Sequence, residues 1–163
     1  MKRILILWLA SSFASFGAVQ YSFTNLAGLP GYSNSGTNDG TGRAARFSYP
    51  IGVAVGSAGN VFVADQNNST IRKVTAAGVV TTLAGNPMYG GSEDGTNGEA
   101  RFSNPAGVAV DHAGNVFVAD TYNHTIRKVT PVGTNWVVTA ILIVGQMGRM
   151  GRMADDPVWP RTP

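Results

Sequence analysis

A block of about 40 residues occurs twice in this chain of 163 residues, and this repeat limits the possible folds more than any other feature. Residues 39–78 align with residues 94–133 without gaps at a constant offset of 55, and 28 of the 40 aligned pairs are identical. Identity at this level implies tandem duplication of one structural unit. We therefore expect a repeat protein in which the residues shared by both copies build the unit.

Each copy divides into four short strands. The apolar runs predict strands over residues 51–55, 61–65, 70–75 and 79–84, and in the second copy over 106–110, 116–120, 125–130 and 136 to about 144. The connections are short and rich in Gly, Asn and Ser, as in antiparallel hairpins. The second strand, Val61-Phe62-Val63-Ala64, does not alternate apolar with polar residues, so both faces of its sheet are expected to be covered. Each copy thus predicts an antiparallel meander of the kind that forms a β-propeller blade.

The repeated blocks resemble those of a known family. P-x-G-V-A-V, G-N-V-F-V-A-D and N-x-T-I-R-K-V follow one another in both copies, with D-G-T ahead of each, and this order is similar to the NHL-repeat propellers of the secreted bacterial kind. Asn123-His124 matches the start of the tripeptide that names the family, whereas Thr125 stands where Leu or Arg often occurs and the other copy has Asn68-Ser69. The resemblance implies an all-β propeller segment over residues 21–145, with blades at about 47–85 and 102–145.

Residues 23–28 repeat the fourth-strand signature of residues 81–85 without three strands before them, which predicts an orphan outer strand. Two complete blades and a spare strand are fewer than the roughly four to eight blades of a closed propeller. The sequence therefore predicts an incomplete propeller, either a fragment of a longer one or a chain of which several copies assemble a ring. Isolated monomers are expected to expose apolar sheet faces and to self-associate. Residues 146–163 lose the pattern and are expected to form an irregular tail.

The amino terminus has the three parts of a secretory signal. Met1-Lys2-Arg3 precedes a short apolar run, Ile4 to Ala10, and small residues follow it. The apolar run is far shorter than the roughly 20 residues that span a bilayer. Residues 1–18 are therefore predicted to be a signal peptide, with a secreted or periplasmic bacterial protein and no membrane span after its removal.

Charge and cysteine content exclude several classes of site. The formal net charge is +3, but between residues 21 and 145 seven basic and seven acidic side chains balance. A nucleic-acid partner is not expected, because phosphate binding needs a clustered basic face. The chain has no cysteine, which excludes disulfides and thiolate sites.

Several polar residues recur at the same place in each copy. Asp and Asn side chains commonly satisfy turn amides, and an Arg can pair with a nearby carboxylate to tie hairpins together. Catalytic residues, in contrast, are normally unique within a ring. We therefore predict structural roles for Asp65, Asn68, Arg72, Asp120, Asn123 and Arg127.

Metal sites receive little support from the sequence. Asp39-Gly40-Thr41 and Asp94-Gly95-Thr96 suggest calcium ligands, but an EF-hand count through Asp94 puts Arg101 at position twelve, where a carboxylate is required. A turn is expected instead, and a weak shared site with Glu93 stays open. His112 and His124 do not form the ligand set of a metal-dependent propeller lyase or lactonase. No catalytic residue, metal or cofactor is predicted.

The connectors between blades, residues 28–47 and 85–102, are the longest loops and differ between the copies. Tyr32, Asn38, Tyr89 and Glu93 are the candidate ligand-binding residues on them. The sequence thus favours a non-catalytic binding or scaffold module for a protein or cell-envelope ligand. The alternative is a fragment of a propeller lyase or lactonase whose metal site lies in blades that this sequence lacks.

Overall fold

The computed structural model describes residues 24–141, which form an all-β fold of two sheets joined by a long connector. The strands are β1 (Gly40–Thr41), β2 (Pro50–Val55), β3 (Val61–Asp65), β4 (Thr70–Val74), β5 (Val79–Gly85), β6 (Gly95–Thr96), β7 (Pro105–Val110), β8 (Val116–Asp120), β9 (Thr125–Val132) and β10 (Asn135–Ala140). Short 3-10 helices lie between them, namely η1 (Tyr32–Asn34), η2 (Gly42–Ala44), η3 (Gln66–Asn68), η4 (Asn97–Glu99) and η5 (Thr121–Asn123). Among the described residues, no helix is long and apolar enough to cross a membrane.

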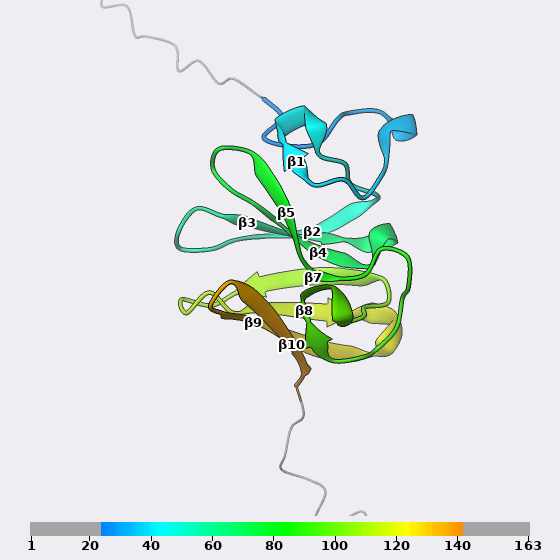
Figure 1. The fold of residues 1–163 in the computed structure, drawn as a ribbon, viewed down its shortest axis with the longest axis vertical. Helices are drawn as coiled ribbons and strands as arrows, with labels where there is room; N and C mark the ends of the chain where they lie inside the picture. Colours follow the sequence, from blue (N-terminus) through cyan, green and yellow to red (C-terminus); the bar gives the residue numbers. More distant parts are fainter. Residues whose placement is uncertain (1–23, 142–163) are drawn as a thin grey trace, which may run out of the picture.

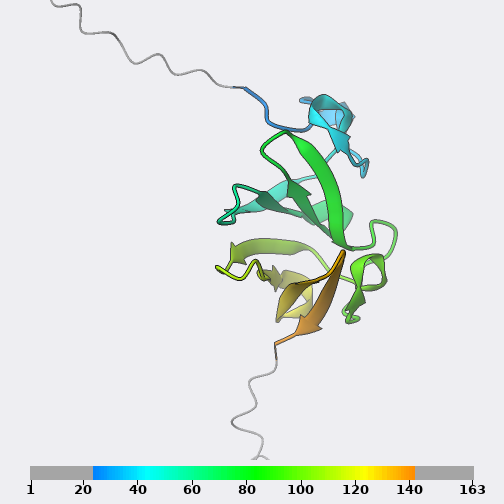
Figure 2. The same ribbon diagram turned by 60° about the vertical axis from the view of Figure 1, so that its left-hand side comes forward.

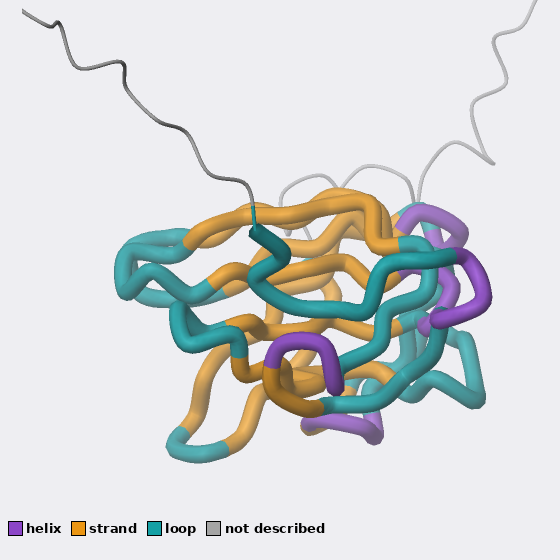
Figure 3. The backbone as a smooth tube through the Cα atoms, turned by 90° about the horizontal axis from the view of Figure 1, so that it is seen from above, coloured by secondary structure: helices purple, strands orange, loops and turns teal. Residues whose placement is uncertain are grey.

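Each sheet is an antiparallel meander. The strand order is β1-β5-β4-β3-β2 in one sheet, which we call blade 1, and β6-β10-β9-β8-β7 in the other, which we call blade 2. Blade 1 lies directly above blade 2 (Figure 1), and the view turned by 60° shows the same stacking (Figure 2). From above, the strands run across the molecule, with turns and connectors at the two ends (Figure 3).

The predicted all-β blades are confirmed, with small differences at the strand ends. In blade 1 each strand begins and ends within one residue of its predicted bounds. In blade 2 the third strand continues to Val132, two residues beyond the prediction, because it forms a longer hairpin with β10. The last predicted strand ends at Ala140, and residues 142–144 of that prediction lie outside the described part of the chain.

Each blade has a fifth, two-residue strand that the sequence interpretation missed. Gly40 and Thr41 pair with Val80 and Val79 of β5, and β6 pairs with β10 in the same way. The chain turns into η2 after this pairing, and glycine at position 40 leaves room for the turn, since a Cβ there would lie only 3.1 Å from the Cβ of Ala44. The Asp-Gly-Thr segments therefore combine the predicted turn with a short bridge to the edge of the blade.

The predicted orphan strand is wrong over residues 24–28, where the chain bends without forming a strand. Phe23, which began that prediction, lies outside the described residues. An outer strand forms by pairing with the third strand of its own sheet, and the part of the chain that the structure describes contains no sheet before blade 1.

The amino-terminal segment nevertheless matches the end of β5 at one residue, Gly28. Gly28 has a φ of 91° and packs on Phe47, just as Gly85 has a φ of 94° and packs on Phe102. A Cβ on either glycine would lie 3.2 or 3.1 Å from the ring of that phenylalanine. The segment therefore lies on blade 1 as the end of β5 lies on blade 2.

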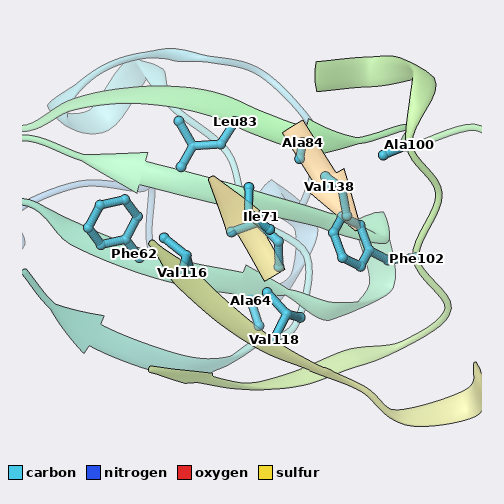
Figure 4. Close-up of a cluster of buried hydrophobic side chains, with 11 residues drawn as sticks. Phe62, Ala64, Ile71, Leu83, Ala84, Ala100, Phe102, Val116, Val118 and Val138 are labelled. Atoms are coloured by element: carbon cyan, nitrogen blue, oxygen red, sulfur yellow. The ribbon is translucent and has the colours of Figure 1, made fainter. Parts of the chain in front are cut away.

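The two blades bury one shared apolar core between their facing sheets (Figure 4). Its buried residues are Phe62, Ala64, Ile71, Leu83 and Ala84 from blade 1 and Ala100, Phe102, Val116, Val118, Val129 and Val138 from blade 2 and its connector. Trp136 packs on this core, and its ring meets that of Phe62 edge-on at 6.1 Å between centroids. Burial of this apolar surface is the main contribution that holds the blades together.

The same five-residue strand uses opposite faces in the two blades. In β3 the buried core side chains are Phe62 and Ala64, whereas in β8 they are Val116 and Val118. Successive side chains on a strand point to opposite faces, so each blade turns one face to the shared core and the other away from it. The sequence predicts that both faces of each sheet are covered. Within residues 24–141, only one face of each blade is covered by the other blade.

Gly52 on β2 allows the inner strands of the two blades to approach closely. A Cβ at this position would collide with the carbonyl oxygen of Ala106 on β7. Gly107 is the equivalent glycine of blade 2, and a Cβ there would meet only the Cβ of Ala119, at 3.4 Å. The same repeated glycine is thus packed against the neighbouring blade in blade 1, whereas in blade 2 its Cβ would contact only a side chain of its own sheet.

Candidate functional site

Arg72 is the centre of a buried polar network in blade 1. Its Nη1 donates to Asp65 Oδ2 at 2.8 Å and to the carbonyl of Arg46 at 2.9 Å. Its Nη2 donates to Asp39 Oδ1 at 2.7 Å and to the carbonyl of Asn38 at 3.0 Å. The Arg72 and Asp65 side chains are 1% and 0% exposed. The guanidinium also lies over the Phe47 ring, with 5.1 Å from Cζ to the ring centroid.

Asp65 ties this arginine to two turns. Its Oδ1 accepts a hydrogen bond from the amide of Ser48 at 2.7 Å, and its Oδ2 accepts one from Asn68 Nδ2 at 2.8 Å. The Asn68 amide also donates to the carbonyl of Gly36 at 2.8 Å. The network therefore fixes the connector that precedes β2 onto β3 and β4.

Blade 2 contains the same network at an offset of 55. Arg127 donates to Asp120 at 3.0 Å, to Asp94 at 2.6 Å, and to the carbonyls of Arg101 and Glu93, both at 2.9 Å. Its guanidinium lies over Phe102 at 5.3 Å.

The Asp120 carboxylate of blade 2 accepts the same two further hydrogen bonds as Asp65 does in blade 1. It accepts hydrogen bonds from the amide of Ser103 at 2.7 Å and from Asn123 Nδ2 at 2.8 Å. The structure thus brings the six repeated polar residues together as two copies of one internal network, with their charged groups facing protein partners.

Asp39 and Asp94 are the members of the networks that sequence reasoning placed elsewhere. The sequence predicts turn residues or, less favourably, calcium ligands at these positions, whereas in the structure each pairs with the arginine 33 residues further along the chain. Asp39 also accepts hydrogen bonds from the amide and hydroxyl of Thr82, at 3.0 and 2.9 Å. The sequence did contain a signal for this pairing, because the Asp and the Arg recur in both copies at the same separation of 33 residues.

Two carboxylates have pKa values displaced in opposite directions. Burial raises the pKa of Asp65 above its ordinary value of 3.8, and hydrogen bonds from Ser48, Asn68 and Arg72 oppose the rise. The hydrogen bond from the Asn115 side chain lowers the pKa of Asp111, which lies in the exposed turn before β8. Burial thus dominates at Asp65, and hydrogen bonding dominates at Asp111.

We expect an NMR titration of the side-chain carboxyl carbons to give a midpoint above 3.8 for Asp65 and below 3.8 for Asp111. A raised pKa means that folded Asp65 binds its proton more tightly than in the unfolded chain. Its ionisation therefore weakens the fold as pH rises from 3.8 through the raised pKa. The sign is reversed for Asp111, whose contribution is present above 3.8 and is lost as pH falls through its lowered pKa. Equal midpoints would contradict this description of the two sites.

The candidate ligand-binding residues lie on the connectors but do not form one site. Tyr32, at the start of η1, is fully exposed, and Tyr89 is 60% exposed beneath the guanidinium of Arg101 at 5.7 Å. Asn38 and Glu93 use their backbone carbonyls in the arginine networks, while their side chains lie on the exposed surface. In Figure 1 the first connector crosses the top of the molecule, and the second runs down its right-hand side.

The histidines are both exposed and lie at different places in blade 2. His112 is in the turn between β7 and β8. His124 follows η5 with a φ of 55°, and Ser69 follows η3 with a φ of 52°. The second position of the family tripeptide, occupied by His124 in one copy and Ser69 in the other, thus has a left-handed backbone conformation. Within residues 24–141, no group of three or more His, Asp or Glu side chains could hold a metal ion.

Two hollows lie on the face of blade 1 that points away from blade 2. One, of about 610 Å³, lies between the amino-terminal segment and the start of β2 and is lined by residues that include Tyr32, Phe47 and Tyr49. The other, of about 440 Å³, is lined mainly by apolar side chains of the sheet, among them Val53 and Val63. Val53, Val61 and Val63 in this lining are repeat residues whose counterparts in blade 2, Val108, Val116 and Val118, pack on the shared core.

Comparison with known proteins agrees with this geometry. The family model described as NHL repeat matches residues 47–74 and 102–129, which cover β2–β4 and β7 to most of β9. NHL repeat-containing protein 2 of Bos taurus is 35% identical over 124 residues, covering 67% of this chain and 17% of that protein. Protein SUPPRESSOR OF QUENCHING 1, chloroplastic, of Arabidopsis thaliana is 38% identical over 95 residues, covering 58% of this chain and 9% of that protein.

A similar solved structure is that of an auxiliary nutrient binding protein from Bacteroides thetaiotaomicron. It has a TM-score of 0.55 and 28% identity, covering 71% of this chain and 28% of that chain. The chain therefore spans less than a fifth of the curated relatives and under a third of this structural neighbour. With two NHL repeats that each form the inner strands of one blade, the chain belongs to the NHL-repeat family.

Proposed function

We propose that this chain is a secreted or periplasmic NHL-repeat segment that binds a protein or cell-envelope ligand through its connectors and has no catalytic role. The observation that carries the proposal is the use of the repeated charged residues. Each arginine donates four hydrogen bonds inside its own blade, to two carboxylates and two backbone carbonyls. Polar groups held this way build the fold, so recognition falls to the exposed and less repetitive connectors.

The connector side chains suit recognition better than chemistry. Tyr32 and Tyr89 are exposed aromatic residues on two successive connectors, and aromatic side chains supply large contact areas in binding sites. The structural neighbour from Bacteroides thetaiotaomicron, described as an auxiliary nutrient binding protein, supports a binding role. The charged start, short apolar run and small residues of positions 1–18 support export.

The test has a location arm and a binding arm. In a bacterial host, the full chain should be recovered outside the inner membrane, and a variant lacking residues 1–18 should stay in the cytoplasm. The purified chain is then screened against arrays of cell-envelope polysaccharides and peptides. For any probe that binds, the double variant Tyr32→Ala/Tyr89→Ala should lose about tenfold in affinity, roughly 1.4 kcal/mol.

Tyr122→Ala is the matched control, because Tyr122 is 67% exposed but lies in η5 rather than on a connector. Its affinity should equal that of the unmodified chain. Binding that survives the double variant would reject the connector surface, and turnover of a bound probe would reject the non-catalytic role.

A further inference from the structure

The face of blade 1 that points away from blade 2 is an apolar sheet with exposed valines. Val53 and Val55 on β2 are 64% and 67% exposed, whereas their counterparts in blade 2, Val108 and Val110, pack on the shared core. Val53 pairs with Val63 and Val55 with Val61 across β2 and β3, so these four side chains share one face. The equivalent face of blade 2 is the one that packs against blade 1 in the shared core.

The far face of blade 2 is the other half of the same joint. Ile126 is 49% exposed, whereas the equivalent Ile71 is fully buried between the blades. Phe117 and Ala119 are partly exposed beside it and correspond to Phe62 and Ala64 of the core. The chain thus carries, on its two outer faces, the same residues that pack together between its blades.

The amino-terminal segment already occupies part of this joint on blade 1. Gly28 packs on Phe47 as Gly85 packs on Phe102, which places the segment where the outer strand of a preceding blade would end. In blade 2, β10 ends at Ala140, the residue equivalent to Thr82 near the end of β5. An incoming blade 2 would therefore place its outer strand next to this segment.

We propose that a second copy of this chain docks the far face of its blade 2 on the open face of blade 1, in the geometry that joins the two blades within one chain. The contact is head-to-tail, because the two surfaces differ, and repetition either closes a ring or continues as a filament. With the two blades of residues 24–141 in each copy, a ring of roughly four to eight blades corresponds to about two to four copies. This proposal is independent of the ligand proposed above.

The joint between copies differs from the internal one at one aromatic residue. Trp136 packs on Phe62 within the chain, but it belongs to the longer β9–β10 hairpin and has Gly78 as its counterpart in blade 1. Phe117 of the incoming copy therefore lacks this ring as a partner. The contact between copies is accordingly expected to be weaker than the contact between blades.

Sedimentation and light scattering of the full chain test the proposal. The unmodified chain should give a concentration-dependent mass that rises above that of the monomer in whole multiples. Val53→Asp, on the open face of blade 1, and Ile126→Asp, on the far face of blade 2, should each reduce it to a monomer. An equimolar mixture of the two variants should form a 1:1 dimer, because each retains the face that the other has lost.

Gly107→Ala gives a milder variant that should also block assembly. Within one chain a Cβ at Gly107 would meet only the Cβ of Ala119, at an ordinary contact distance of 3.4 Å, whereas a Cβ at the equivalent Gly52 would collide with the neighbouring blade. The control substitutions are Gly98→Ala, whose Cβ would meet only the carbonyl of Gly85 at 3.9 Å, and Val132→Asp, at a valine 55% exposed on the β9 hairpin. Both should assemble like the unmodified chain.

Circular dichroism checks that each variant is folded. An unmodified chain that is monomeric at all concentrations would overturn the proposal. So would an assembly that Val53→Asp and Ile126→Asp leave intact, or a mixture of the two variants that remains monomeric. The mixture also separates head-to-tail docking from a symmetric dimer of like faces, which the mixed variants would not restore.

Discussion

Replacing Arg127 with methionine is expected to destabilise the chain by about 3–5 kcal/mol, because it leaves the buried Asp120 carboxylate without its cationic partner. Asp120 is fully buried, and the Arg127 side chain is 1% exposed. The substitution also removes the donors to the carbonyls of Glu93 and Arg101, which fix the connector before β7. Urea unfolding followed by circular dichroism measures the loss. Because a domain of this size is only marginally stable, Arg127→Met is expected to be largely unfolded at 37 °C.

A second variant keeps this prediction testable if the first does not fold. Asp120→Asn/Arg127→Met removes the unpaired charge while retaining a carbonyl oxygen for the amide of Ser103, so it should be more stable than Arg127→Met alone. Arg43→Met is the control, because Arg43 is exposed and should change stability by no more than about 0.5 kcal/mol. If Arg127→Met unfolded at the same urea concentration as Arg43→Met, the structural role of the network would be rejected.

The repeat allowed the blades to be predicted closely from sequence. The strands β3 and β8 occupy their predicted bounds because G-N-V-F-V-A-D combines a turn with an uninterrupted apolar run. The amino-terminal segment shows the limit of such matching. It carries the fourth-strand signature, but a strand forms only where another strand offers hydrogen-bond partners, and the described residues before blade 1 offer none.

The arginine networks were predicted only in part. Asp65 and Arg72 lie on adjacent paired strands, seven residues apart, so a local reading connects them. Asp39 comes from the connector that passes over the blade, and its pairing with Arg72 depends on the path of that connector. Its contact with Thr82 also has no visible counterpart in blade 2, where Ala140 stands at the equivalent position and has no hydroxyl.

Sequence also could not show which face of each blade packs on its neighbour. V-F-V-A is apolar on both faces, so Phe62 and Val63 are equally suited to a core. The choice depends on the side from which the other blade arrives, and it differs between β3 and β8. That difference leaves identical side chains buried in one blade and open in the other.

The matched pair Ile71 and Ile126 measures what packing between blades contributes. Both occupy the second position of the same strand sequence, but Ile71 is fully buried between the sheets and Ile126 is 49% exposed. Ile71→Ala should cost about 2–5 kcal/mol through lost apolar burial and the cavity that remains. Ile126→Ala should cost less than about 1 kcal/mol, because its site is largely open to solvent.

The measurement that tests this account most directly is the difference in unfolding free energy between these two alanine variants. Both are made in the Val53→Asp background, so that association between copies does not contribute, and both are unfolded in urea under the same conditions. We expect Ile71→Ala to be less stable than Ile126→Ala by about 2 kcal/mol or more. Equal losses at the two positions would contradict a shared core between the blades.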